Sequence, residues 1–386
     1  MEYKFKHEEL CCGCGLCSTA CHANAIEMKQ NSEGFLYPDV DENICVECGQ
    51  CNEICSYNDA AVNAGKLPAS AYVCRAKDTE ILMSSASGGL FSVFADMFIE
   101  NNGYVAGASF DRNMDVVHVI CNSQSDAKAL RSSKYVQSNI IDCFNKVADL
   151  LKNDKEVLFS GTPCQIAAIT KYLKYNKVDT KNLTTCSIIC HGVNSGLIWH
   201  KYLEFLSPVV GEPFAVNMRD KRFGSGYNMT VRGKKGVYEK KGTKDPFIML
   251  FTKNLALRKS CFNCPMKNMK QISDLTIGDF HYAKKYYPQY CDGKGISVLL
   301  VNTEKGMKVF EKVSEKIEYK KTSLEKAAQP NLIGQIDKSF LEQRNIFFDV
   351  VNKKGFLKAL SKYTEVGMKN HAIGAGKRLI KKLIGR

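Results

Sequence analysis

The chain has 386 residues, of which 45% are hydrophobic, and it carries a formal net charge of +14. Charged residues interrupt the apolar stretches, as Asp96 does between Leu90 and Ile99, so no segment offers the roughly 20 apolar residues of a membrane-spanning helix. The basic residues are dispersed and come without an aromatic RNA-binding signature, which argues against nucleic-acid binding.

The N-terminal sequence MEYKFKHEEL lacks the apolar stretch of a secretory signal, so we expect a cytoplasmic protein whose thiols stay reduced. Eighteen cysteines in such a compartment indicate metal or redox chemistry rather than disulfides. The length favours a small N-terminal module, residues 1–60, followed by a larger domain.

Two cysteine runs in the first sixty residues share the spacing C-x2-C-x2-C-x3-C. They comprise Cys11, Cys14, Cys17 and Cys21 in one run, and Cys45, Cys48, Cys51 and Cys55 in the other. This is the spacing of bacterial ferredoxins with two 4Fe-4S clusters, in which the fourth cysteine of each run binds the other cluster. We therefore assign Cys11, Cys14, Cys17 and Cys55 to one cluster, and Cys45, Cys48, Cys51 and Cys21 to the other.

Details around the two runs support this interpretation. Gly15 and Gly49 fit because cluster sulfurs need close backbone approach. The proline that usually follows the fourth cysteine is replaced by His22 and by Ser56. Zinc also binds paired C-x2-C units and is the alternative. Cys12 is left as a spare thiol beside the cluster loop.

Residues 61–70 belong to a small, polar, aperiodic stretch that predicts a linker. In the domain that follows, from residue 71 to 330, we expect a helix over 88–100 and strands over 104–110 and 116–121. Three strands that each lead into a helix are expected at 156–160, 185–190 and 296–302. This alternation predicts an α/β or mixed α+β domain.

Three loops carry small and polar residues where strands end or helices begin, which is where α/β sheets bind ligands. They are SSASGGLFS at 84–92, SGTPCQ at 160–165 and CHGVNSG at 190–196. The first could present backbone N–H groups to a phosphate, although serine is also common at an ordinary helix start.

Cys261 and Cys264 form a further C-x2-C pair, which needs two more ligands to hold a cubane. Cys164 and Cys190, in two of the loops above, are the natural candidates for a third 4Fe-4S site. Free buried thiols or a zinc pair are the alternatives. We expect the cysteines at 74, 121, 143, 186 and 291 to fill the core.

The whole chain resembles the coenzyme F420 hydrogenase/dehydrogenase beta-subunit family, preceded by its ferredoxin module. The stretches that carry the resemblance are SASGGLFS at 85–92, SSKYVQS at 132–138, LFSGTPCQIAA at 158–168, CHGVNS at 190–195, the CFNC pair, DLTIGDF at 274–280 and GISVLLVNTEKG at 295–306. The implied fold is a dicluster ferredoxin module followed by a mixed α/β domain that binds a flavin and a 4Fe-4S cluster.

The resemblance implies that FAD lies near Ser87, Gly88, Gly89, Ser133, Lys134, Tyr135, Gly161 and Thr162, with cluster ligation by Cys164, Cys190, Cys261 and Cys264. Lys134 could offset phosphate charge or be an ordinary surface lysine. Asp279 could help to fix the flavin or could simply form a turn.

The implied function is an iron–sulfur flavoprotein oxidoreductase. In it, a hydride carrier such as reduced F420, or ferredoxin, exchanges electrons with an acceptor through FAD and the clusters. No catalytic side chain is nominated. The alternative is a non-catalytic electron-relay subunit of a larger redox or surface-polysaccharide biosynthesis system, which would work only with a redox partner protein.

Residues 331–386 are expected to form a helical extension that ends in KNHAIGAGKRLIKKLIGR, a short basic amphipathic helix. It could touch an anionic membrane surface, although a solvated terminal helix is the simpler interpretation. Three clusters of charge about −2 would leave the holoprotein at roughly +8, which suits an anionic cofactor or an acidic redox partner.

Overall fold

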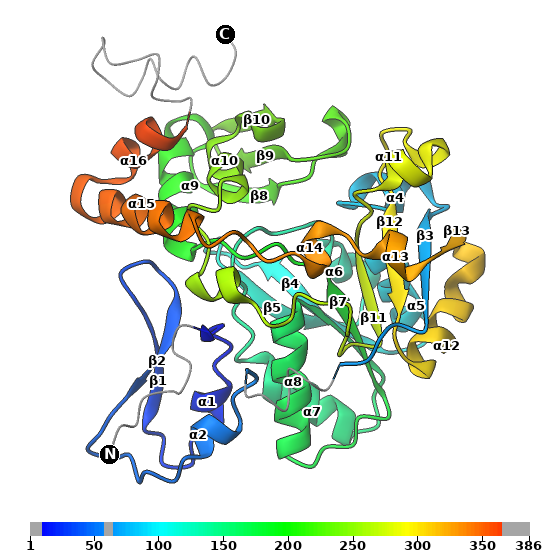
Figure 1. Ribbon diagram of the computed structural model, residues 1–386, viewed down its shortest axis with the longest axis horizontal. Coiled ribbons are helices and arrows are strands. Elements are labelled where there is room, and N and C mark those ends of the chain that lie inside the picture. The colour runs from blue at the N-terminus through cyan, green and yellow to red at the C-terminus, as the bar shows by residue number, and fades with distance from the viewer. Residues whose placement is uncertain (1–9, 58–64, 365–386) are drawn as a thin grey trace.

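The computed structural model describes residues 10–57 and 65–364 of the chain (Figure 1). In the N-terminal module, β1 (Ile26–Gln30) and β2 (Leu36–Val40) pair as an antiparallel hairpin. Two short helices, α1 (Leu16–Thr19) and α2 (Gln50–Glu53), lie beside it. The module is thus a hairpin and two helical turns between the cysteine runs.

An eight-stranded mixed sheet organises the large domain, in the order β13-β3-β12-β11-β7-β6-β4-β5. The strands are β3 (Ser70–Ala76), β4 (Tyr104–Phe110), β5 (Val116–Cys121), β6 (Val157–Gly161), β7 (Leu183–Ile188), β11 (Leu275–Asp279), β12 (Ser297–Val301) and β13 (Ile317–Thr322). The four central strands β11, β7, β6 and β4 are parallel, and the outer pairs are antiparallel. The carboxyl ends of the parallel strands therefore open at one edge of the sheet.

Alternation along the central strands divides the core between the two faces of the sheet. Leu158 of β6 packs with α5 (Leu90–Glu100) and α12 (Glu304–Val313) on one face. Its neighbours Val157 and Phe159 point to the other face, against α7 (Cys143–Lys152) and α8 (Pro163–Tyr175). The sheet is thus covered on both sides, as its nearly continuous apolar strands require.

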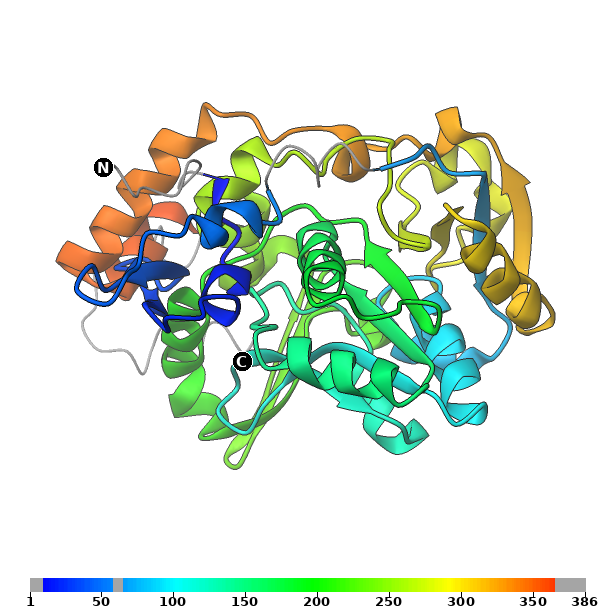
Figure 2. The ribbon, with the colours of Figure 1, turned by 90° about the horizontal axis from the view of Figure 1, so that it is seen from below.

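A second core lies beside this sheet. It is built by a three-stranded sheet, β10 (Gly236–Lys241), β9 (Asn228–Gly233) and β8 (Pro213–Asn217), with α9 (Gly196–Val210), α10 (Pro246–Thr252), α15 (Phe340–Lys354) and α16 (Phe356–Tyr363) around Trp199. Phe35, from the turn of the β1–β2 hairpin, is 1% exposed and belongs to the same core. Figures 1 and 2 both show the N-terminal module beside α9 and α15.

Shorter helices complete the connections of the large domain. They are α4 (Thr79–Ser84), α6 (Gln124–Ala127), α11 (Ala283–Tyr286), α13 (Leu324–Ala327) and α14 (Pro330–Ile333). Between residues 65 and 364, and in residues 10–57, no helix has the length and apolarity to cross a bilayer. The C-terminal amphipathic segment lies outside the described residues.

The strand-to-helix units expected from sequence are present, as β6 with α8, β7 with α9, and β12 with α12. The sequence pattern missed β3 and β11, and it missed the three-stranded sheet, whose strands mix charged and apolar residues. Four of the expected core cysteines, at 74, 121, 143 and 186, are buried. Cys291 is exposed, so the expectation for that residue was wrong, because it follows the surface turn after α11.

Candidate functional site

The first cysteine set of the N-terminal module surrounds one cavity. Cys11, Cys14, Cys17 and Cys55 line a cavity of 190 Å³, and Cys51 of the other set reaches its wall. Gly15 begins α1 with φ of 75°. A Cβ at this position would lie 2.3 Å from Cγ1 of Ile141, so the close approach requires glycine.

The second set repeats this local geometry. Gly49 begins α2 with φ of 74°, as Gly15 begins α1. Cys45 and Cys48 lie close enough to Cys51 to raise the pKa of its thiol, in addition to the larger effect of burial. Cys48 is exposed. Cys21 accepts a hydrogen bond of 3.3 Å at its Sγ from the backbone N–H of Ala25.

The two residues that replace the usual prolines both make contacts. Nδ1 of His22 lies 3.0 Å from Oε1 of Gln50, which ties the end of the first run to α2. Ser56 is fully buried, and its hydroxyl lies 3.7 Å from Sγ of Cys14 and 3.9 Å from Sγ of Cys12. Side-chain contacts therefore hold the turns that proline would otherwise shape.

Four cysteines from distant parts of the chain meet around a second cavity of 60 Å³. Cys164 lies in the first turn of α8, Cys190 follows β7, and Cys261 and Cys264 lie at the turn η5 (Lys259–Asn263). The Thr162 hydroxyl is 3.1 Å from Sγ of Cys164. The structure thus brings together the four residues that the resemblance implies, and Cys12 joins them in the same wall.

The cysteine sets have the chemistry of cluster sites rather than of single-ion sites. Every cysteine in them is free of disulfides. Within the described ranges, no three His, Cys, Asp or Glu side chains are arranged to hold a single metal ion. A cubane, unlike zinc, keeps its four thiolates apart around a core that itself fills space, so cavities bounded by separate thiols fit clusters.

A third and larger cavity of 240 Å³ opens at the carboxyl ends of the parallel strands. The sequence-predicted residues that line it are Ser87, Gly89, Ser133, Lys134, Tyr135, Gly161 and Thr162. Gly88 does not line it, because its N–H bonds Ser297 Oγ at 2.9 Å and a Cβ there would lie 2.6 Å from the Cys74 carbonyl oxygen. Gly88 is needed for close packing of its loop on β3 and β12.

Lys134 is neither an exposed lysine nor a free ammonium. Its Nζ donates to the carbonyl oxygens of Ala129 and Arg131, each at 2.9 Å, and to that of Ser132 at 3.4 Å. Burial lowers the pKa of Lys134 to about 7. An ammonium has three protons to donate, and all three face the loop carbonyls, so Lys134 fixes the loop that forms this wall.

Sequence reasoning missed Arg219, which pairs with Asp279 in the same cavity. Nη1 of Arg219 lies 2.8 Å from Asp279 Oδ2 and 3.0 Å from the Tyr135 hydroxyl. Burial alone would raise the pKa of Asp279, but the Arg219 guanidinium holds it below its usual value. The Nε of Arg219 is buried and has no hydrogen-bond partner among the described residues, so the cavity presents a free donor.

His118 was also missed, because a lone histidine in a strand gives no signal of its surroundings. Its Nε2 lies 2.9 Å from the Ser160 carbonyl oxygen and its Nδ1 lies 2.7 Å from the Ser138 hydroxyl. The carbonyl can only accept, so Nε2 carries the proton. Burial lowers the pKa of His118 to about 4, which makes it a neutral wall of the larger cavity.

Comparison with known families decides the relationship of both parts of the chain. Residues 154–327 match the family described as the C terminus of the coenzyme F420 hydrogenase/dehydrogenase beta subunit, and residues 10–58 match the 4Fe-4S dicluster domain family. The chain therefore carries an F420 hydrogenase/dehydrogenase beta-subunit domain behind a dicluster ferredoxin domain. The dicluster match implies two 4Fe-4S clusters.

Among solved structures, the chain is similar to one in the xenon-derivatised F420-reducing NiFe hydrogenase complex from Methanosarcina barkeri. The two share 16% sequence identity with a TM-score of 0.48, over 73% of this chain and 94% of that one. No curated protein matches the chain.

The two family spans cover the cysteine sets but only part of the larger cavity. The dicluster domain contains all eight N-terminal cysteines, and the beta-subunit domain contains Cys164, Cys190, Cys261 and Cys264. The walls formed by residues 85–92 and 132–138 lie before the beta-subunit match begins. The assignment of a ligand to this cavity therefore depends on its own geometry.

Proposed function

We propose that this protein is an iron–sulfur flavoprotein oxidoreductase with three 4Fe-4S clusters and one FAD. It passes electrons between a hydride carrier, such as reduced F420, or ferredoxin, and an acceptor. The clusters are held by Cys11, Cys14, Cys17 and Cys55, by Cys45, Cys48, Cys51 and Cys21, and by Cys164, Cys190, Cys261 and Cys264.

One observation carries the proposal, which is that three cavities lie in a row and share walls. Cys12, Gly13, Cys14 and Tyr57 line both the cavity of the first cysteine set and that of Cys164. Thr162, Cys190 and the residues up to Val193 line both the Cys164 cavity and the larger one. A row of redox groups in these places would lie in contact through a few side chains.

The larger cavity suits a flavin by its position and lining. It lies at the carboxyl ends of β6, β7 and β11, where α/β sheets bind such ligands. Its walls combine small residues with hydroxyls, as at Ser87 and Thr162, and with the rings of Tyr135 and Tyr227. The unpartnered Nε of Arg219 supplies a donor for an acceptor atom of the ligand.

A bound flavin supplies the exchange between two-electron and one-electron chemistry, and the chain supplies its surroundings. Arg219 and Asp279 form a buried ion pair at 2.8 Å that keeps a fixed charge arrangement in the cavity wall. The Thr162 hydroxyl at Cys164 Sγ provides a hydrogen bond to a cluster ligand, a kind of contact that tunes cluster potentials.

The test is turnover by the isolated full-length chain after anaerobic reconstitution with iron, sulfide and FAD. Reduced F420, NADH and reduced ferredoxin are offered in turn, with a viologen dye as electron acceptor. We expect steady turnover with at least one of these donors.

Absence of turnover with every donor, in a preparation with full iron and flavin content, would contradict the enzyme proposal. It would favour a relay subunit that works only when docked on a partner. A preparation that binds no FAD would contradict the flavin assignment itself.

A further inference from the structure

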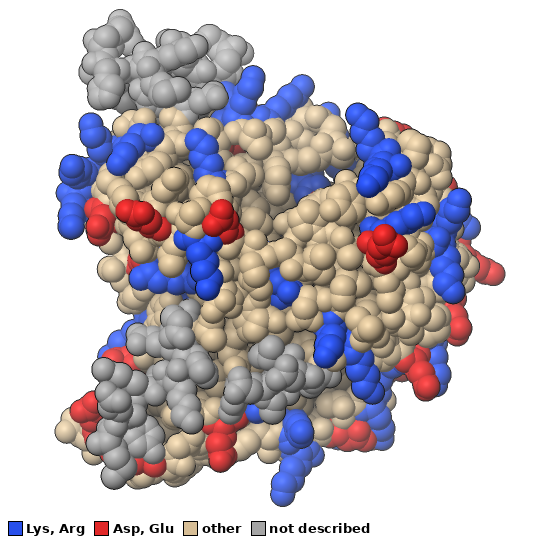
Figure 3. All heavy atoms as spheres, viewed as in Figure 1, with Lys and Arg blue, Asp and Glu red and all other residues tan. Residues whose placement is uncertain are grey.

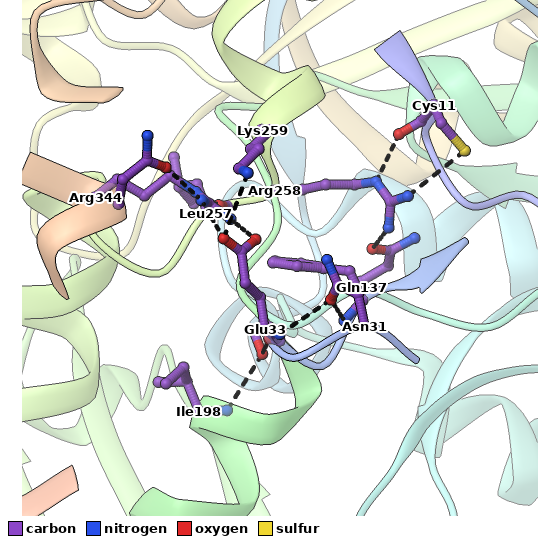
Figure 4. A network of polar contacts seen from close by, with 12 residues as sticks. Cys11, Asn31, Glu33, Gln137, Ile198, Leu257, Arg258, Lys259 and Arg344 are labelled. Carbon is purple, nitrogen blue, oxygen red and sulfur yellow. Dashed lines mark hydrogen bonds and ion pairs between the residues drawn. The ribbon is translucent and has the colours of Figure 1, made fainter. Parts of the chain in front are cut away.

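A buried arginine of the large domain contacts the first cysteine set. Arg258 is 1% exposed, and Figure 4 shows its guanidinium directed at Cys11. Its Nε donates to the Cys11 carbonyl oxygen at 2.6 Å, and Nη2 lies 3.6 Å from Cys11 Sγ. Nη2 also donates to the Leu36 carbonyl oxygen at 2.8 Å, and the guanidinium stacks on the Tyr37 ring at 4.2 Å.

The cysteine loop is shaped to receive this side chain. A Cβ on Gly13 would lie 2.7 Å from Nη1 of Arg258, so only glycine leaves room for the guanidinium. Gln137 accepts from Nη1 of Arg258 at 3.1 Å and donates to the Cys12 carbonyl oxygen at 2.8 Å. Two residues of the large domain thus grip the backbone of Cys11 and Cys12.

The charge of Arg258 has no carboxylate partner within residues 10–57 and 65–364. The carboxylate of the same network, Glu33, pairs with Arg344 and Lys259 instead (Figure 4). A buried and unpaired cation costs several kcal/mol, so a counterion is expected at the guanidinium. An oxidised 4Fe-4S core with four thiolates carries a charge of about −2 and would meet this need at Cys11.

The second cysteine set has the opposite surroundings. Residues 30–57, which contain Cys45, Cys48, Cys51 and Cys55, include acidic side chains and no lysine or arginine. Cys48 of this set is exposed, whereas Arg258 and its contacts at the first set are buried. A nearby cation stabilises the reduced, more negative cluster, and nearby anions destabilise it.

We propose that Arg258 raises the reduction potential of the cluster at Cys11, Cys14, Cys17 and Cys55 above that of its neighbour in the module. This inference rests on the proposed function for the presence of the clusters. The first electron that enters the module then stays on this cluster. Its ligand loop shares a wall with the Cys164 cavity, and the Arg258 backbone accepts from Cys261 N–H at 3.0 Å, so the electron waits beside the third set.

The test is a redox titration of the reconstituted full chain, followed by electron paramagnetic resonance. Replacement of Arg258 by Gln is expected to lower the midpoint of one cluster by the equivalent of at least a tenfold loss in its reduction equilibrium, about 59 mV for one electron. Arg258→Lys keeps the charge and is expected to restore most of the shift. Unchanged midpoints in Arg258→Gln with full iron content would overturn the proposal.

Two matched controls separate the charge from loss of docking. Lys259→Gln removes a neighbouring positive charge whose side chain pairs with Glu33 at 3.7 Å rather than with a cysteine. Glu33→Gln weakens the contact between the module and α15 while Arg258 stays. Both are expected to leave the midpoints unchanged, and a shift as large as that of Arg258→Gln in either would contradict a specific role for Arg258.

A measurement on the unmutated chain decides the matter if Arg258→Gln fails to assemble. Protein labelled with ¹⁵N-arginine is reduced with dithionite to one electron per chain, and pulsed resonance is used to detect guanidinium nitrogen coupled to the cluster spin. Coupling in this state is expected, and its absence would overturn the proposal. Neither experiment involves FAD or a hydride carrier, so failure of the proposed enzyme activity would be seen separately.

Discussion

His118 illustrates how single buried residues fix the walls of the larger cavity. Its ring stacks on Phe159 and links the Ser138 hydroxyl to the Ser160 carbonyl, so it joins the strand end of β6 to the 132–138 segment. The neutral form is required, because Nδ1 must accept from Ser138 while Nε2 donates. The protonation of one imidazole therefore controls the packing of this wall.

Stability is expected to fall with acid through His118. Its pKa of about 4 in the folded protein lies below the ordinary 6.5, so the unfolded chain binds the extra proton between these values, and folding is disfavoured as pH falls. The expected loss between pH 7.5 and pH 5 is about 2 kcal/mol. Thermal unfolding of the anaerobic protein at both pH values measures it.

The variants that test this prediction differ only at the hydrogen-bonded pair. His118→Gln cannot titrate, so its midpoint is expected to depend less on pH than that of the unmutated protein. Ser138→Ala keeps the imidazole and its bond to Ser160, and it is expected to keep the full dependence. Equal pH dependence in all three proteins would show that His118 is not the responsible group.

Among elements, the β1–β2 hairpin is the one that holds the two domains together. Its turn inserts Phe35 into the core of α9 and α15, where it lies 6.3 Å from the Phe348 ring. The hydroxyl of Ser195, at the start of α9, donates to the Glu33 carbonyl oxygen. The hairpin is thus part of a core that the rest of the large domain completes.

Gly34 at the hairpin turn permits a matched test of this docking. Gly34 has φ of +77°, and a Cβ there would lie 2.3 Å from Leu197 Cβ; Gly293 has φ of +81° with nothing within 4 Å. Alanine at either position costs about 1 kcal/mol through the backbone. Gly34→Ala is expected to cost about 2 kcal/mol more through the clash with α9.

Thermal unfolding, with hydrogen exchange over β1 and β2, measures the difference between these two variants. We expect a lower midpoint and faster exchange in Gly34→Ala than in Gly293→Ala. Equal effects of both substitutions would mean that the hairpin does not pack on α9 in solution.

The elements show where sequence reasoning succeeds. The units β6–α8 and β12–α12 were predicted because a short apolar run meets a strong helix start, Thr162–Pro163 in one and Thr303 in the other. The strands β8 to β10 were missed because their exposed faces carry lysine and arginine, which hides the alternation. For the site, spacing identified the eight module cysteines, but Arg219 and Arg258 carry no motif and become significant only through their tertiary contacts.

At the scale of the molecule, the ferredoxin module is part of the folded body. Arg344 of α15 is fully buried and pairs with Glu33, while its Nε donates to the Leu257 carbonyl oxygen beside Arg258 (Figure 4). One network thus connects the C-terminal helices, the hairpin and the first cysteine loop. Elsewhere, Figure 3 shows lysine and arginine scattered over the visible face.

The central claim is a chain of three clusters and one flavin in adjoining cavities. The most direct measurement is iron, sulfide and flavin content of the anaerobically purified protein beside Cys261→Ala and Cys12→Ser. We expect about twelve irons and one FAD in the unmutated chain, about eight irons in Cys261→Ala, and about twelve in Cys12→Ser, whose thiol lines the cavity without ligating a cluster. About eight irons and no flavin in the unmutated chain would contradict the account.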